Sequence, residues 1–140
     1  MDFRQTTVTA LAADVAARRI AAREVVAAAL ERIDALNPAV NAFVAVDPEQ
    51  AMAGAADLDE RLAAGEEVGP LTGIPLGVKD LEDAAGFRTT YGSALHAEDP
   101  PAVADSALVE RLRAAGCIVV GKTNTPEHGH KADTTNTLFG

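Results

Sequence analysis

This sequence of 140 residues has little cysteine, few aromatic side chains and few basic residues. Cys117 is its single cysteine, so no internal disulfide can form and a reducing, cytoplasmic compartment is expected. Only 12 Lys and Arg residues face 21 Asp and Glu residues, and the net charge of -9 argues against nucleic acid and anionic membranes as partners. No apolar run reaches the roughly 20 residues of a membrane-spanning helix.

The remaining composition, 48% hydrophobic and 24% charged, is typical of a soluble globular protein. Its length fits one domain of ordinary size or a part of a larger one. Alanine fills many apolar positions and aromatic residues make up only 4%, so each buried side chain contributes little area. We therefore expect a modest hydrophobic core.

Hydrophobic periodicity predicts four helices, with Thr9 as the N-cap of the first and Asp105 as the N-cap of the last. The dipeptide Asn37-Pro38 is expected to end the second helix. In the last helix, Leu108 and Leu112 are expected to face inward. The predicted helices cover residues 9–18, 23–36, 48–63 and 106–115.

Short apolar runs predict three strands, at residues 41–46, 73–80 and 117–120, and a polar, loop-like chain after Gly121. Strands that alternate with helices are typical of the α/β class. The sequence therefore predicts a mixed, largely parallel sheet that helices cover on both faces.

The predicted strand at residues 73–80 carries a lysine, Lys79, at its end. A lysine at the end of a buried strand costs desolvation energy unless it is paired, reaches water or is neutral, and a neutral lysine is a base. Asp80 and Glu82 are possible partners in a purely structural arrangement, which is the more frequent one. A functional role is also open, because ligands of α/β sheets bind at the carboxyl ends of strands.

Residues 116–123, GCIVVGKT, match the phosphate-loop pattern G-x-x-x-x-G-K-[ST]. A phosphate loop follows a strand and opens a helix, whereas here a helix is predicted before Gly116 and the middle residues favour a strand. Nucleotide binding at residues 116–123 is therefore an unfavoured alternative.

No metal site or cysteine nucleophile is predicted. His128 and His130 lie near Glu127 and Asp133, but no third ligand stands at a convincing spacing and His96 is far off in sequence. Cys117 lies in an apolar strand without an activating base, which is the setting of an inert core cysteine.

Seven segments, taken in order, carry a resemblance to a known family: ERIDALNP (31–38), NAF (41–43), GPLTGIPLGVKD (69–80), GFRTTYGS (86–93), ERLRAAG (110–116), GKTNTPE (121–127) and LFG (138–140). Over essentially its whole length the sequence resembles the amidase signature family. The resemblance implies that residues 1–140 form a single, incomplete domain, the N-terminal part of the amidase signature fold.

The resemblance also implies a hydrolase of small-molecule amides with a Ser–cis-Ser–Lys triad and neither metal nor organic cofactor. Lys79 matches the catalytic lysine, which acts as a base when neutral. Both triad serines belong to a Gly/Ser-rich segment that follows the LFG stretch in the family. Ser93 and Ser106 are the only serines here and neither lies in such a segment, so the 140 residues alone are expected to be inactive.

In the family, the stretch after residues 121–124 approaches the substrate, which makes Glu127, His128, Gly129 and His130 candidates for the substrate pocket. His128 stands where an aromatic residue such as Phe is frequent. Full-length relatives are expected as homo-oligomers or as components of amidotransferases. A non-catalytic remnant or binding module is the alternative to an amidase.

Overall fold

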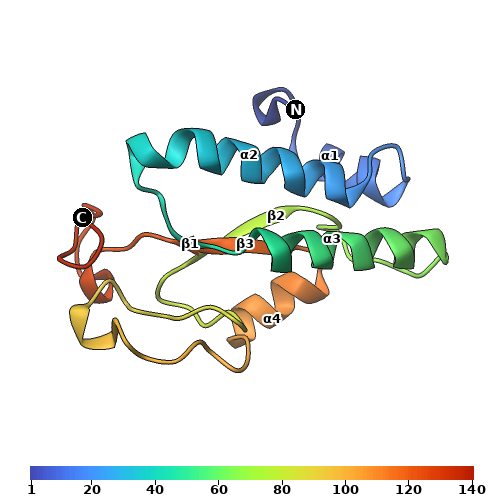
Figure 1. Ribbon diagram of the computed structural model, residues 1–140. Helices are drawn as coiled ribbons and strands as arrows, with labels where there is room; N and C mark the ends of the chain where they lie inside the picture. The colour runs from blue at the N-terminus through green and yellow to red at the C-terminus, as the bar shows by residue number, and fades with distance from the viewer.

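The computed structural model describes all 140 residues and shows a three-stranded sheet between two layers of helices (Figure 1). Helices α1, α2 and α3 pack together on one face, and α4 lies on the other. The α/β class with a mixed sheet is therefore confirmed. The elements are η1 (Phe3–Gln5), α1 (Val8–Ala16), α2 (Ala22–Val40), β1 (Phe43–Val46), α3 (Pro48–Ala63), β2 (Pro75–Lys79), η2 (Ala94–His96), α4 (Ala107–Ala114), β3 (Ile118–Thr123) and η3 (Glu127–Gly129).

The first two helices have different ends from those predicted. The N-cap of α1 is Thr7, whose hydroxyl accepts a hydrogen bond from the Ala10 amide at 3.1 Å, and Thr9 lies inside the helix. Helix α2 continues through Pro38 to Val40. The Asn37 side chain donates to the Phe43 carbonyl at 2.9 Å and accepts from the Phe43 amide at 2.7 Å. These two bonds hold the last turn of α2 against the start of β1, which explains why Asn37-Pro38 does not end the helix.

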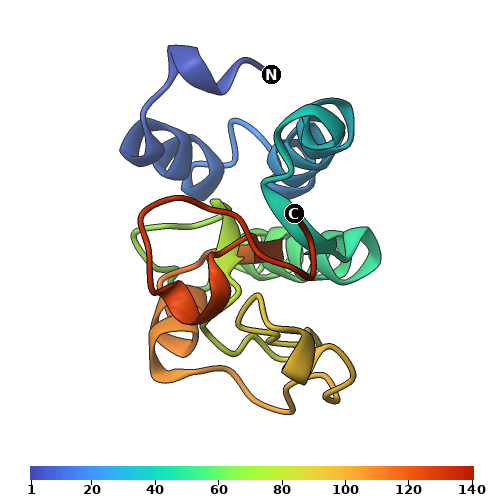
Figure 2. The same ribbon diagram turned by 90° about the vertical axis from the view of Figure 1, so that its left-hand side faces the viewer.

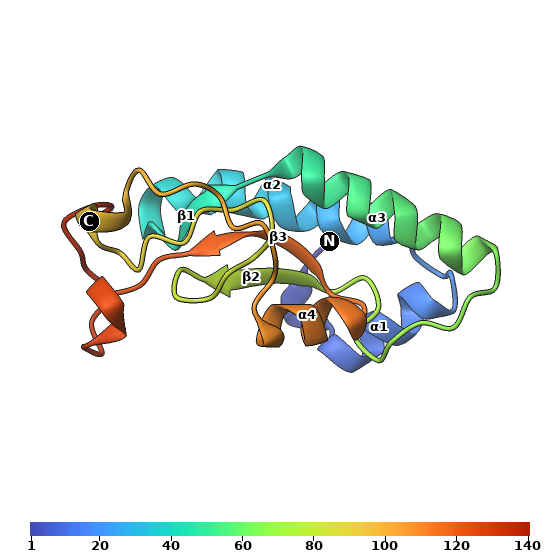
Figure 3. The ribbon, with the colours of Figure 1, turned by 90° about the horizontal axis from the view of Figure 1, so that it is seen from below.

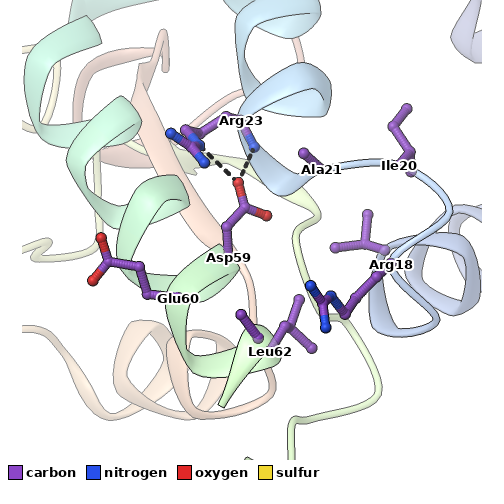
Figure 4. A pocket seen from close by; sticks show the side chains of 9 residues that line it. Arg18, Ile20, Ala21, Arg23, Asp59, Glu60 and Leu62 are labelled. Carbon is purple, nitrogen blue, oxygen red and sulfur yellow. Dashed lines mark hydrogen bonds and ion pairs between the residues drawn. The ribbon is translucent and has the colours of Figure 1, made fainter. Parts of the chain in front are cut away.

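The N-terminus of α2 lacks a capping side chain of its own, because its N-cap is Ala21. Asp59 of α3 takes that role from another helix (Figure 4). Its carboxylate accepts from the Ala22 amide at 2.7 Å and from the Arg23 amide at 3.3 Å, and it pairs with the Arg23 guanidinium at 2.9 Å. The cap therefore also fastens α2 to α3.

Helix α3 has the predicted bounds, but α4 differs from the prediction in its cap and its buried face. The N-cap of α4 is Ser106, and Asp105 instead accepts from the Ala85 amide at 2.7 Å. Val109 is the buried residue of α4, whereas Leu108 is 53% exposed. The expectation of an inward Leu108 was wrong because the helix buries a narrower stripe than its apolar residues suggested.

The strands lie in the order β1-β3-β2, with β1 antiparallel and β2 parallel to the central β3. Strand β3 runs to Thr123, so the expectation of a loop after Gly121 was wrong. The extension has a simple cause: β3 is flanked on both sides, and its last residues pair with Lys79 and with Phe43.

A β-bulge at Val120 changes which side chains of β3 share a face. Leu76 pairs with Val119, but the next residue, Gly77, pairs with Gly121, so Val120 is the extra residue. Beyond the bulge, Lys122 pairs with Val78 and lies on the same face of the sheet. Without the bulge, alternation would place Lys122 on the face of Val120, among the helices α1 to α3.

Two apolar clusters stabilise the fold, one on each face of the sheet. The larger one joins α1, α2 and α3 to Ile118 and Val120 of β3. The smaller one joins α4 and the segment 81–105 to Val78 and Val119. None of the helices combines the length and the apolar character that a membrane crossing requires.

Replacing Asp59 by alanine should weaken the joint between α2 and α3. We expect Asp59→Ala to lower the free energy of unfolding by about 1 kcal/mol, the usual cost of losing a helix cap. Urea unfolding followed by circular dichroism measures the change. Asp57→Ala is the matched control, since this carboxylate lies on the same helix, is 70% exposed and faces Arg61 at 3.8 Å. Equal destabilisation by both variants would contradict the capping role.

Candidate functional site

The carboxyl ends of β2 and β3 meet at one edge of the sheet, where Lys79 pairs with Thr123 (Figure 3). The segments that follow these strands, residues 80–96 and 124–130, lie next to each other at this edge (Figure 2). The His128 amide donates to the Tyr91 carbonyl at 2.8 Å and joins the two segments. In sheets of this class, the carboxyl end of parallel strands is where ligands bind.

Lys79 is exposed at this edge, and its ammonium group makes no hydrogen bond or ion pair. Both carboxylates that the sequence offered as its partners are engaged elsewhere. Asp80 pairs with Lys122 at 3.1 Å, and Glu82 accepts from the Ser106 hydroxyl at 2.7 Å. The buried cation of the site is therefore Lys122, and Lys79 stays open to water.

Lys122 and Asp80 form a buried ion pair, with side chains 0% and 1% exposed. The Lys122 ammonium also donates to the Thr89 hydroxyl at 2.8 Å and to the Arg88 carbonyl at 3.1 Å. Asp80 accepts from the amide of Thr90 at 3.1 Å and from its hydroxyl. A buried ion pair repays its desolvation only when further hydrogen bonds satisfy both partners, as they do here.

The phosphate-loop pattern at residues 116–123 lacks the structure that phosphate binding requires. Residues Ile118–Thr123 form a strand, α4 precedes Gly116, and the Lys122 ammonium points into the core. The backbone amides of this strand pair with β1 and β2 and do not line an open loop.

The four pocket candidates lie in and just beyond η3. Glu127 accepts from the Ser93 hydroxyl at 2.6 Å, and His128 adopts a left-handed backbone conformation with φ of 50°. Gly129 lies beside Leu81, two residues after Lys79, and its lack of a Cβ permits the approach. His130 is exposed. The arrangement brings η3 close to the end of β2.

Three rings meet at this edge, although their residues are distant in sequence. The Tyr91 ring centroid lies 5.1 Å from that of His96 and 5.8 Å from that of His128, and the two imidazoles are 6.0 Å apart. His96 Nδ1 also contacts Asp99 Oδ2 at 2.7 Å. His96 was set aside as too far from His128 in sequence, so this ring cluster of Tyr91, His96 and His128 was missed. No group of three or more His, Cys, Asp or Glu side chains is placed to hold a metal ion.

The remaining nucleophile candidates are engaged or buried. The Ser93 hydroxyl donates to Glu127, and the Ser106 hydroxyl donates to Glu82 while capping α4. Cys117 is buried, and burial raises the pKa of its thiol, which disfavours the reactive thiolate. These contacts give the three side chains structural roles.

Comparison with known proteins identifies the family. A family model described as Amidase matches residues 24–140, and the chain belongs to this family. It is 43% identical over 132 residues to an acylamidase from Rhodococcus erythropolis. It is also 44% identical over 140 residues to the amidase-like component of a glutamyl-tRNA(Gln) amidotransferase from Acidothermus cellulolyticus. These matches cover 94% and 99% of the chain.

A solved structure resembles the fold closely. It is the inhibitor-bound form of a complex described as vestigial, which reveals the evolutionary origins of an s-triazine catabolic enzyme. The TM-score is 0.91 at 38% identity, over 96% of this chain and 30% of that one. The chain likewise spans 28% of the acylamidase and 27% of the amidotransferase component.

Breaking the buried ion pair should destabilise the fold far more than removing Lys79. Lys122→Met leaves the Asp80 carboxylate buried without its cation, so we expect a loss of about 3–5 kcal/mol in the free energy of unfolding. Lys79→Met, an exposed control, should change it by about 0.5 kcal/mol or less. Urea unfolding gives both values. Adding Asp80→Asn to Lys122→Met should restore part of the loss, and equal effects of the two single variants would refute the assignment.

Proposed function

We propose that this chain supplies the lysine-bearing part of an amidase site that hydrolyses the carbon–nitrogen bond of small amides. The supporting observation is the contrast between the two lysines at the sheet edge. Lys122 is fully engaged in the core, whereas Lys79 stands at the carboxyl end of β2 with an unengaged ammonium group. Lys79 is also the residue that matches the family's catalytic lysine.

In the Ser–cis-Ser–Lys mechanism, Lys79 acts as the general base. Its neutral amine takes a proton, through a bridging serine, from the serine that attacks the amide carbonyl. Collapse of the tetrahedral intermediate breaks the carbon–nitrogen bond, and the proton held by Lys79 passes to the leaving amine. Water then hydrolyses the acyl-enzyme. A neutral amine requires a drier site than the open edge of these 140 residues provides.

The serines of this chain do not fit the two serine roles. The Ser93 hydroxyl donates to Glu127 at 2.6 Å and its side chain is fully buried, while Ser106 caps α4. We therefore propose that the 140 residues alone do not hydrolyse amides, and that the activity needs a serine-bearing segment beside Lys79.

Substrate contacts are proposed for residues Glu127, His128, Gly129 and His130, which adjoin the end of β2 through the contact of Gly129 with Leu81. The ring cluster adds Tyr91 and His96 to this surface. The named relatives, an acylamidase and an amidotransferase component, both suit an amide substrate. The second relative also keeps a role within a larger assembly in view.

A chimeric enzyme tests the role of Lys79. The matched segment of the Rhodococcus erythropolis acylamidase is replaced by this chain, and hydrolysis of an aryl acylamide is measured. We expect turnover by the chimera and a loss of kcat by about a hundredfold or more in its Lys79→Ala variant, the effect of removing a general base. Arg32→Gln, which removes an exposed cation of α2, should leave turnover unchanged.

Two outcomes would overturn the proposal. One is turnover by the isolated 140-residue chain that Lys79→Ala abolishes, since the chain would then need no added serines. The other is a chimera whose kcat is insensitive to Lys79→Ala. A chimera that folds but turns over no substrate would favour the non-catalytic alternative.

A further inference from the structure

A cavity of about 350 Å³ lies between the end of α1, the start of α2 and the end of α3 (Figure 4). It is at the opposite end of the sheet from Lys79, so it is separate from the candidate amidase site (Figure 3). Val15, Ile20 and Leu62 give it apolar walls. Val15 and Leu62 belong to the main core, which makes that side of the cavity firm. A volume of this size suits a small ligand.

The charges around the cavity are unequally satisfied. Asp59 is neutralised by the Arg23 guanidinium and by the Ala22 and Arg23 amides. The Arg18 guanidinium makes no hydrogen bond or ion pair, although it lines the same cavity and extends toward Leu62 in Figure 4. Glu60 points to the other side of α3, away from Arg18. The inner side of the cavity therefore presents one unpaired cation beside an apolar wall.

The backbone of Arg18 fixes the place of this cation. Arg18 follows the C-cap of α1 with φ of 57°, and its amide donates to the Val15 carbonyl at 2.8 Å. Glycine is the residue that fits such a left-handed position at least cost, so a long basic side chain here is unusual. The turn directs the guanidinium across the mouth of the cavity and not along α1.

We infer that this cavity binds a small aliphatic carboxylate, whose anionic head pairs with Arg18 and whose branched tail packs on Val15, Ile20 and Leu62. A guanidinium matches the two oxygens of a carboxylate in a bidentate geometry. A single cation in a protein of net charge -9 disfavours a dianion such as phosphate. The site is independent of the proposed amidase function.

Titration of the full chain with isovalerate, followed by amide NMR, tests the inference. We expect saturable shifts of the Ile20 and Ala63 amides at millimolar ligand. Isoamyl alcohol, which has the same tail without the charge, and inorganic phosphate should each bind about tenfold more weakly or worse. Saturable binding of phosphate as tight as that of isovalerate would overturn the ligand class.

Two substitutions at Arg18 and one elsewhere separate the site from a general effect. Arg18→Gln should weaken isovalerate binding about tenfold or more, and Arg32→Gln, an exposed cation on α2, should not change it. Arg18→Gly should also abolish binding while keeping or raising the melting temperature, because glycine relieves the left-handed backbone. An absence of saturable shifts in the parent chain, or unchanged binding in Arg18→Gln, would refute the inference.

Discussion

The buried ion pair between Asp80 and Lys122 is the constraint on which the sheet edge depends. A cation inside an apolar face costs several kcal/mol unless its partner and its hydrogen bonds are complete. The pair is complete because the segment after β2 returns to supply the Thr89 hydroxyl and the Arg88 carbonyl. Three separate pieces of chain, the end of β2, the end of β3 and residues 88–90, are thereby held at one point.

The bulge in β3 and the alternation of β2 separate the two lysines of this edge. The extra residue, Val120, brings Lys122 onto the face of Val78, where Asp80 can reach it. Lys79 lies between Val78 and Asp80 in the strand, so its side chain leaves from the opposite face. A lysine suited to chemistry and a lysine suited to stability thus stand on opposite faces of a single edge.

Local patterns predicted the elements well where one helix or strand decides its own structure. Helix α3 has the predicted bounds because Asp47, Pro48 and its apolar stripe all act within that helix. The errors arose where another part of the chain intervenes. Asn37 binds Phe43 and lets α2 pass Pro38, and Asp105 binds the Ala85 amide and leaves the cap of α4 to Ser106.

The site was predictable only in part, for the same reason. The position of Lys79 at a strand end followed from the apolar run before it, and its catalytic role rests on the family resemblance. The contact between Tyr91, His96 and His128 depends on how two loops meet, which no local pattern encodes. Lys122 carried a usable signal: a lysine that continues an apolar strand predicts a buried carboxylate partner.

The distinction between the lysines can be measured directly, because the chain has only three of them, Lys79, Lys122 and Lys131. The native chain is treated with limiting acetic anhydride, and the rate of acetylation at each site is read by mass spectrometry. The account predicts that Lys79 and Lys131 react readily, while Lys122 reacts at a small fraction of their rate until urea unfolds the chain. Acetylation of Lys122 in the native chain as fast as that of Lys79 would contradict it.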